Sequence, residues 1–322
     1  MVSKKAVLVG INDYESINDL RGCLNDVVNM RETLMKYRGF TAQDIRVVVD
    51  KRANADNIKH RLEWLVDGAQ PGDQLFFHFS GHGSQIRDRN GDELNDHKDE
   101  ILCLYGMDWD EGYLTDDYFD ELFKRIPNGV TFDVFFDCCN SGTGEGVSRS
   151  FMGDTNRDLR NRYLEPPLDI TLRAEGEKLP TKRLAVASFF SSWFSFLAPT
   201  PAPAPMPIPD MGKPDEEEVA IQPEPVSVEE PVVEEKPEPA NVNQIVIWSG
   251  CGEAQTSADA YISGAYNGAF TYYWCKHMRD SNGNLSRVDL LERVKTSLVS
   301  GRYTQIPELT CNEYSSNQKV LF

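Results

Sequence analysis

The sequence predicts an α/β fold with a mainly parallel central sheet that is covered by helices. Two observations indicate this class. Short apolar runs rich in β-branched and aromatic residues alternate with longer segments whose apolar residues have helical spacing. The chain can also bury a core, because 40% of its 322 residues are hydrophobic, including 16 Phe, 12 Tyr and 5 Trp.

The expected elements follow in order from the N-terminus, each strand as a short apolar run and each helix as a longer amphipathic segment. We expect strands at 5–10, 45–49, 74–80, 100–104, 131–137, 244–248 and 319–322, and helices at 20–37, 56–68, 268–279 and 287–297. A further apolar run at 184–197 is too short to span a membrane, and we interpret it as a buried strand followed by a loop.

Residues 199–241 differ in composition from the rest of the chain. They hold 12 of the 18 prolines and carry 11 acids against 2 lysines, which is −9 of the total net charge of −18. Such a segment cannot bury enough apolar surface to order itself. We therefore expect a disordered, self-repelling linker between a larger N-terminal part and a smaller C-terminal part.

Charge and cysteine usage exclude several classes of protein. A net charge of −18 argues against nucleic acid or an anionic membrane as a partner and favours cationic ligands, metal ions or basic substrates. No apolar run reaches 18 residues, and the N-terminus carries no secretory apolar region, so we expect neither a membrane span nor export. Seven cysteines without a C-x-x-C pair favour free thiols in a reducing cytoplasm.

Two turns with reactive side chains directly follow predicted strands: Gly-His-Gly (81–83) and Cys-Cys (138–139). Because the carboxyl ends of parallel strands meet at one edge of a sheet, we expect the imidazole of His82 and a thiol on the same rim. An imidazole can take the proton of a thiol, and the thiolate is a strong nucleophile. The amides of Gly83 and Cys139 are candidate donors to the developing oxyanion. Taken singly, a buried cysteine or a turn histidine is more often structural.

These turns belong to a series of motifs that resembles the metacaspases, a family of caspase-like cysteine peptidases. In chain order the motifs are VGINDY (9–14), LRGCLNDV (20–27), FHFSGHGSQ (77–85), NGDELNDHKDE (90–100), YLTDDYFDEL (113–122), FFDCCNSGTG (135–144), WSGCGEAQTSADA (248–260) and GAFTYYW (268–274). The resemblance covers nearly everything except 199–241. It implies a caspase-like three-layer α/β/α sandwich. A large-subunit-like region (1–165) and a small-subunit-like region (242–322) would complete one fold, joined by an intersubunit linker (166–241).

The resemblance also implies which cysteine acts. The family motif D-[SC]-C-H-S-G has the nucleophile third, which corresponds to Cys139 and leaves Cys138 in a structural place. His82 corresponds to the base. Asn140 stands where the family commonly has His, and this departure removes one possible proton carrier near the site.

The resemblance implies cleavage after Arg or Lys, with the acids of the pocket at Asp26 and Asp137 and an added hydroxyl at Ser80. Two carboxylates on one rim suit a cationic side chain, whereas an enzyme for acidic substrates would carry Arg there. The plainer interpretations are a turn-capping acid for Asp137 and a solvated helix position for Asp26.

A calcium site is a further implication of the resemblance. It assigns ligands to Asp99, Asp116 and Asp117, with Glu145 as the nearest acid for a fourth position. The acidic stretch 87–100 does not have the ligand spacing of an EF-hand loop. The alternatives are a solvated acidic loop and, for Asp116 and Asp117, capping of the helix that they precede.

We therefore expect a calcium-activated, self-processing cysteine endopeptidase, a cytoplasmic monomer that acts on proteins or peptides with Arg or Lys before the cut. A calcium-independent peptidase of the same fold and a catalytically weak scaffold or regulator remain alternatives. Self-processing is expected after Arg173, Lys178 or Arg183. The lysines of the acidic tract, Lys213 and Lys236, each precede a proline, which fits poorly just past a scissile bond.

Overall fold

The computed structural model describes residues 2–15, 18–87, 98–139, 159–167, 170, 244–252 and 255–321. Its centre is a six-stranded sheet with the order β12-β9-β7-β3-β1-β2. The strands are β1 (Lys4–Gly10), β2 (Ile45–Val49), β3 (Gln74–Ser80), β7 (Thr131–Asp137), β9 (Gln244–Ser249) and β12 (Glu308–Thr310). All neighbours pair in parallel except β12, which runs antiparallel to β9.

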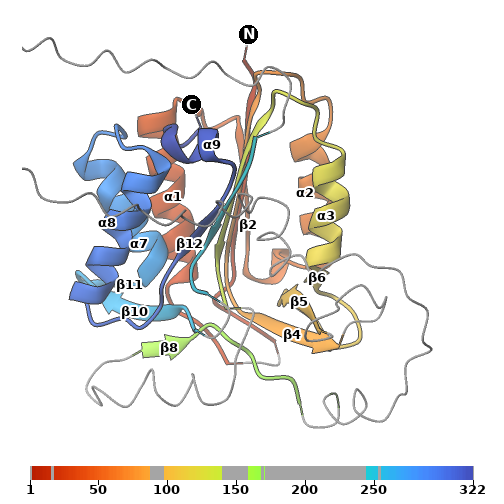
Figure 1. Ribbon diagram of the computed structural model, residues 1–322. Helices are drawn as coiled ribbons and strands as arrows, with labels where there is room; N and C mark the ends of the chain where they lie inside the picture. The colour runs from red at the N-terminus through yellow and green to blue at the C-terminus, as the bar shows by residue number, and fades with distance from the viewer. Residues whose placement is uncertain are drawn as a thin grey trace, which may run out of the picture.

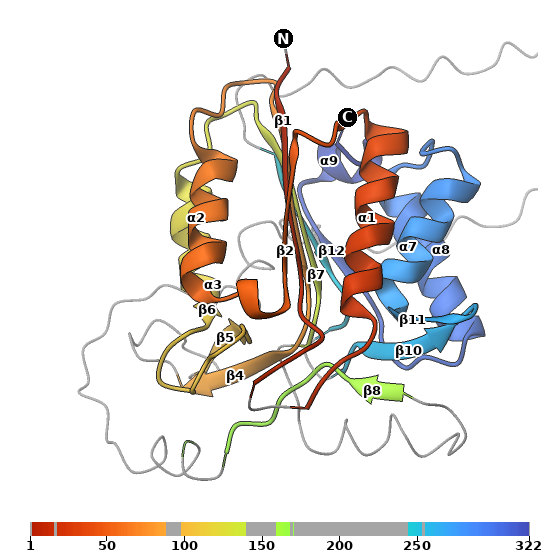
Figure 2. The ribbon, with the colours of Figure 1, turned by 180° about the vertical axis from the view of Figure 1, so that it is seen from behind.

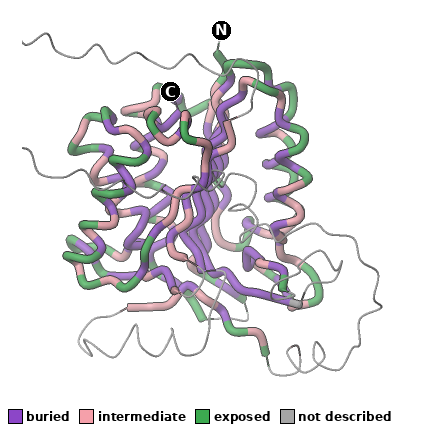
Figure 3. Tube along the Cα trace, in the orientation of Figure 1, coloured by how far each residue is buried: buried purple, intermediate pink, exposed green. Residues whose placement is uncertain are grey.

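Helices cover both faces of this sheet (Figures 1 and 2). One face carries α2 (Ala55–Val66) and α3 (Asp116–Lys124); the other carries α1 (Cys23–Arg38), α7 (Ala269–Asp280), α8 (Arg287–Ser300) and the short α9 (Glu313–Asn317). Because successive strand residues point to opposite faces, Val7 and Val9 of β1 pack in one core cluster, and Ala6 and Leu8 pack in the other. Figure 3 shows the buried residues concentrated along the central strands.

Two small antiparallel sheets lie at the carboxyl end of the central strands, at the bottom of Figure 1. One contains β4 (Gly83–Arg87), β5 (Lys98–Leu102) and β6 (Leu114–Thr115). The other contains β8 (Leu159–Asn161), β10 (Ala258–Ile262) and β11 (Ala265–Gly268). A single 3₁₀ turn, η1 (Asp50–Arg52), follows β2. The small sheets therefore surround the edge at which the predicted reactive turns lie.

Side-chain caps explain where several helices begin. Asn54 accepts a hydrogen bond from the amide of Asn57 at the start of α2, and Thr115 and Ser286 cap α3 and α8 in the same way. Such caps satisfy backbone N–H groups that have no partner within the helix. Helix α1 begins at Cys23 and not at the expected residue 20, and its N-cap position is Gly22, without a side-chain cap.

One buried ion pair links the sheet to the α8 layer. Asp133 of β7 and Arg287 of α8 are both fully buried, and the guanidinium donates to the carboxylate at 2.8 and 3.2 Å. The indole N–H of Trp248 in β9 donates to the same carboxylate at 3.0 Å. The pair is thus held by partners from three elements, as a buried charge requires.

The predicted fold class is confirmed: helices enclose a mainly parallel sheet on both sides. Six expected elements have no more than one residue of error at either end, and β2, β3 and β7 match their predicted ranges. The expected strand at 319–322 is wrong. Lys319 forms only an isolated bridge to Ser286, and the edge of the sheet is formed by β12 instead.

The apolar run 184–197 and the acidic tract 199–241 lie outside the described residues. Within the described part, none of the helices is long and apolar enough to cross a membrane.

Candidate active site

The register of β3 and β7 brings the two reactive turns together. Ser80 at the end of β3 pairs with Asp137 at the end of β7. His82 and Cys139 each follow two residues later, so both leave the sheet at the same edge. Both side chains are almost completely buried, with exposed fractions of 2% and 0%. The sequence placed them on one rim because parallel strands end at a common edge.

The imidazole of His82 is held by neighbouring backbone and by Tyr14. Its Nε2 lies 2.7 Å from the carbonyl oxygen of Asn18, and its ring lies 4.9 Å from the Tyr14 ring, centroid to centroid. The backbone N–H of His82 donates to the Tyr14 hydroxyl at 2.8 Å. A carbonyl accepts only from a protonated nitrogen, so Nε2 carries the hydrogen of the neutral ring and Nδ1 is left as the proton acceptor. Nδ1 is buried and has no hydrogen-bond partner in the described part of the chain.

Burial lowers the pKa of His82, and the backbone carbonyls of Asn18 and Arg162 oppose this effect. The neutral form of the imidazole is therefore favoured, which is the form that a general base requires.

The two adjacent cysteines have different surroundings. Cys139 donates its S–H to the carbonyl of Ser257 at 3.8 Å and accepts the backbone N–H of the same residue. Cys138 packs in the core cluster that contains α2 and α3, and burial raises the pKa of its thiol. A hydrogen bond with Cys139, together with burial, raises the pKa of Cys251. In this arrangement the Cys139 sulfur is hydrogen-bonded to the backbone of Ser257. Among the described contacts there is no hydrogen bond between the Cys139 sulfur and His82.

The three residues expected to bind a substrate cation converge on a guanidinium of the chain itself. Arg162, fully buried, follows β8 and donates to Asp26 at 2.8 Å and to the Ser80 hydroxyl at 2.9 Å. The guanidinium also lies 3.2 Å from the carboxylate of Asp137 and 3.3 Å from that of Asp259. We call the set of Ser80, Asp26, Asp137 and Asp259 the cation pocket.

Residues from the C-terminal part hold the carboxylates of the cation pocket in place. Asp137 accepts hydrogen bonds from the Ser257 hydroxyl at 2.6 Å and from the Thr271 hydroxyl at 2.7 Å. Asp26 accepts the backbone N–H of Gly268 at 2.9 Å. The plainer interpretation of Asp26 as a solvated position is therefore wrong, because its side chain is fully buried. The carboxylate of Asp137 also accepts the backbone N–H of Thr271, at the start of α7, at 3.1 Å.

The cation pocket carries an excess of negative charge, because three carboxylates face one guanidinium. Burial, as the largest cause, raises the pKa of Asp26 to about 7; Arg162 opposes this shift and Asp137 reinforces it. A pocket of this kind stabilises a cation and leaves a neutral or acidic side chain without compensation.

Sequence reasoning missed Arg162, Asp259, Ser257 and Thr271. The last three lie within the motifs 248–260 and 268–274. The motifs therefore indicated that these segments belong to the family's fold, but not that the three side chains form or hold the cation pocket. Arg162 lies in none of the motifs, and its partners are 25 to 136 residues away in the chain. No local pattern could have indicated it.

The expected calcium ligands lie together in part. Asp99 is in β5 and Asp116 begins α3; antiparallel pairing of β5 with β6 brings the two elements side by side, and both carboxylates are buried. Thr115, not Asp116 or Asp117, is the helix cap. Carboxylate oxygens are the donors that calcium prefers. Within the described ranges, however, no group of three or more His, Cys, Asp or Glu side chains is placed to hold a metal ion. Glu145 and the acids at 88–97 lie outside these ranges.

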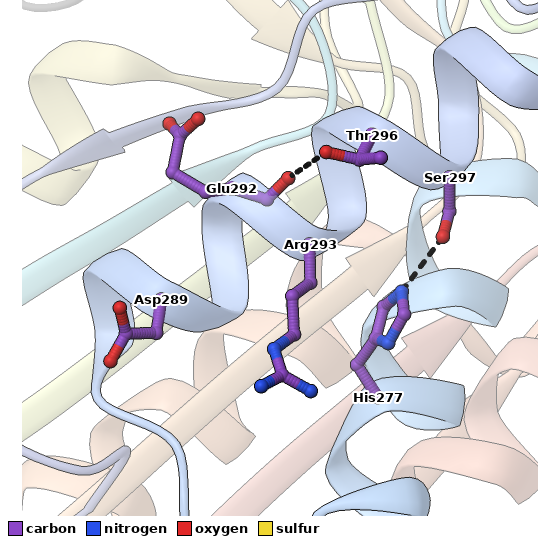
Figure 4. Close-up of a pocket in the computed structure, with 6 residues that line it drawn as sticks. All are labelled: His277, Asp289, Glu292, Arg293, Thr296 and Ser297. Carbon is purple, nitrogen blue, oxygen red and sulfur yellow. Dashed lines mark hydrogen bonds between the residues drawn. The ribbon is translucent and has the colours of Figure 1, made fainter.

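A separate pocket between α7 and α8 shares no residue with this site (Figure 4). Its His277 is hydrogen-bonded to Ser297 at 2.8 Å, and the Thr296 hydroxyl donates to the backbone carbonyl of Glu292 at 2.9 Å. Local hydrogen bonds thus occupy these polar groups.

Comparison with known proteins agrees with this geometry. Residues 4–146 match the family model "Metacaspase, peptidase C14 domain". Metacaspase-1 of Pyricularia oryzae is 31% identical over 99% of this chain and 74% of its own length, and Metacaspase-1A of Aspergillus niger is 33% identical over 96% and 70%.

The fold also occurs among solved structures. The crystal structure of a Geobacter sulfurreducens protein superposes with a TM-score of 0.61 at 20% identity, over 99% of this chain and 98% of that one. Fold, motif order and sequence similarity over nearly the whole chain lead to one conclusion: the chain belongs to the metacaspases, a family of cysteine-type endopeptidases.

Proposed function

We propose that the protein cuts peptide bonds after Arg or Lys, with Cys139 as nucleophile and His82 as general base. The observation that supports this most directly is the cation pocket, whose carboxylates and hydroxyl surround the guanidinium of Arg162. The backbone N–H of Gly83 points to the carbonyl of the same arginine, at 2.9 Å. The cation pocket can therefore bind the side chain of a residue whose carbonyl accepts the N–H of Gly83.

The mechanism follows from these positions. The Cys139 thiol turns from Ser257 toward the imidazole and gives its proton to Nδ1 of His82. The thiolate attacks the carbonyl carbon of the bound Arg or Lys, and the N–H groups of Gly83 and Cys139 stabilise the oxyanion. The imidazolium, held through Nε2 by the Asn18 carbonyl, then protonates the leaving amine. Water hydrolyses the thioester and restores the thiol.

The test is hydrolysis of short fluorogenic peptides that end in Arg, Lys or Asp. Arg and Lys peptides should be cut, and Asp peptides should not, since a carboxylate would enter a pocket that is already negative. Cys139→Ala should abolish hydrolysis. Efficient cleavage after Asp by the wild type, or equal activity of Cys139→Ala, would contradict the proposal.

We further propose that calcium activates the enzyme through Asp99, Asp116 and Asp117, with the remaining ligands from Glu145 or water. Buried carboxylates on β5 and α3 support this proposal. Asp117→Asn should weaken activation by millimolar calcium, and Asp110→Asn, in the exposed loop before α3, serves as the matched control. Full wild-type activity in excess chelator would favour the calcium-independent alternative.

We also propose that the protein acts in the cytoplasm as a monomer. All seven cysteines belong to the described residues and none is in a disulfide, which supports a reducing compartment. Analytical ultracentrifugation of the full chain should give a single species of one-chain mass; a stable dimer at micromolar concentration would contradict the proposal.

A further inference from the structure

Residues 159–164, here called the cleft segment, bind across the active site as a substrate peptide would. Strand β8 pairs antiparallel with β10, and the register joins Asn161 to Ala258 and Leu159 to Ala260. Addition of an extended peptide to the edge of a sheet is a common mode of peptide recognition, because main-chain hydrogen bonds fix the register. Figure 1 shows β8 beside β10, below the ends of the central strands.

The backbone hydrogen bonds continue through the catalytic turns. The carbonyl of Arg162 accepts from the N–H of Gly83 at 2.9 Å, and the N–H of Arg162 donates to the carbonyl of Ser257 at 3.2 Å. Past this residue, the N–H of Leu164 donates to the carbonyl of Gly83 at 2.9 Å. The peptide is thus fixed on both sides of the Arg162–Tyr163 bond. The carbonyl of that bond meets the proposed oxyanion donor.

The side chains select the same residue. Arg162 is fully buried in the cation pocket, whereas Arg160, two residues earlier, donates to the backbone carbonyl of Asp19 at the edge of the cleft. A comparison with Arg287 is informative. That arginine is equally buried, but among the described residues its ion pair is with the carboxylate of Asp133 alone. Arg162 thus has three acids where Arg287 has one. The surplus fits a pocket made to capture cations.

We propose that the cleft segment is an internal substrate and that the Arg162–Tyr163 bond is the processing site of the chain. Until this bond is cut, the segment occupies the pocket that other substrates need. The inference rests on the proposed function, because it requires an active Cys139 and a preference for Arg. It differs from the expectation of a cut after Arg173, Lys178 or Arg183, which lie outside the described residues.

The step uses only water as co-reactant. His82 takes the proton of Cys139, and the sulfur forms a bond to the carbonyl carbon of Arg162. The C–N bond to Tyr163 breaks, and the proton on His82 passes to the new amine. Water then cleaves the thioester, which leaves Arg162 with a free carboxylate and returns a proton to the Cys139 sulfur. The products are a fragment that ends at Arg162 and one that begins at Tyr163.

The experiment is N-terminal sequencing and intact mass of the full-length protein after incubation with and without calcium, with peptide hydrolysis measured on the same samples. A new N-terminus at Tyr163 is expected in the wild type and none in Cys139→Ala. Arg162→Lys should keep the cut, and Arg162→Gln should abolish it. Arg160→Gln, the matched control, should leave the cut at the same bond. Uncut wild type should hydrolyse Arg peptides with a lag that disappears as the cut proceeds.

The outcomes separate this inference from the proposed function. Hydrolysis of Arg peptides by a chain that stays intact, or that is cut at another bond, would overturn the inference and leave the proposed function standing. If no peptide is hydrolysed under any condition, both fail. Arg162→Gln leaves three buried acids without their cation and can impair folding. The wild-type terminus and the Arg162→Lys variant therefore decide the matter by themselves.

Discussion

Replacement of Asp26 by Asn tests the cation pocket with little change in shape. The new amide oxygen can still accept the N–H of Gly268. In the wild type the Ser80 hydroxyl donates to Asp26; in the variant the amide NH₂ can donate to that hydroxyl, so a hydrogen bond between the two residues is kept. What is lost is one carboxylate at 2.8 Å from the bound guanidinium. Asp137 and Asp259 remain, so the cation keeps some compensation.

The magnitude follows from that partial loss. A hydrogen bond to a charged group contributes about 1.5–3 kcal/mol. Each 1.4 kcal/mol is about tenfold in rate, so kcat/KM for an Arg peptide should fall by roughly 10- to 150-fold. The larger penalty of about 3–5 kcal/mol applies only when a buried charge loses its sole partner, which is not the case here.

The raised pKa of Asp26 adds a dependence on pH. With a pKa of about 7, the carboxyl group is mainly ionised at pH 8 and mainly protonated at pH 6. Below pH 7 the wild type loses the charge that the Asn variant never has. The ratio of wild-type to variant kcat/KM should therefore be largest near pH 8 and shrink toward pH 6.

The assay compares kcat/KM from pH 6 to pH 8 for peptides that end in Arg and for matched peptides that end in citrulline, which has a similar shape and no charge. The fall should occur for Arg and be nearly absent for citrulline. An equal fall for both substrates would indicate a structural defect and refute the reasoning. The same conclusion would follow from a ratio that is constant with pH or from no fall at all.

Three further predictions concern the dyad and the core. Cys138→Ser should keep most of the activity that Cys139→Ala abolishes, because Cys138 packs in the core; a loss of over 100-fold would contradict this. Burial lowers the pKa of His82, so the base stays neutral as pH falls through its ordinary value of about 6.5. In Asp26→Asn, where the titration of Asp26 no longer contributes, the acid limb of kcat/KM should therefore lie below that value. A limb at or above it would be inconsistent with a buried base. Arg287→Met should lower the free energy of unfolding in urea by about 3–5 kcal/mol, because Asp133 is left unpaired, and a loss under about 1 kcal/mol would argue against the pair.

The sequence by itself determined the central sheet and the place of the catalytic residues. β3 and β7 are Phe-rich runs that precede Gly-His-Gly and Cys-Cys, and parallel strands bring such ends to one edge. His82 and Cys139 could therefore be placed without any knowledge of long-range contacts. The order of the motifs then indicated the family.

Only the tertiary structure decided how the pocket is built and what fills it. Asp26 accepts its backbone hydrogen bond from Gly268, 242 residues away, and Asp137 is held by Thr271 across 134 residues. Neither contact leaves a periodic signal, because the start of α7 meets Asp26 of α1 and Asp137 at the end of β7 only in the folded chain. Arg162 follows the short strand β8 in a segment without a motif, and its role depends on which carboxylates surround it. Local sequence fixes strands and turns through backbone preferences, whereas the partner of a buried charge is chosen by the fold.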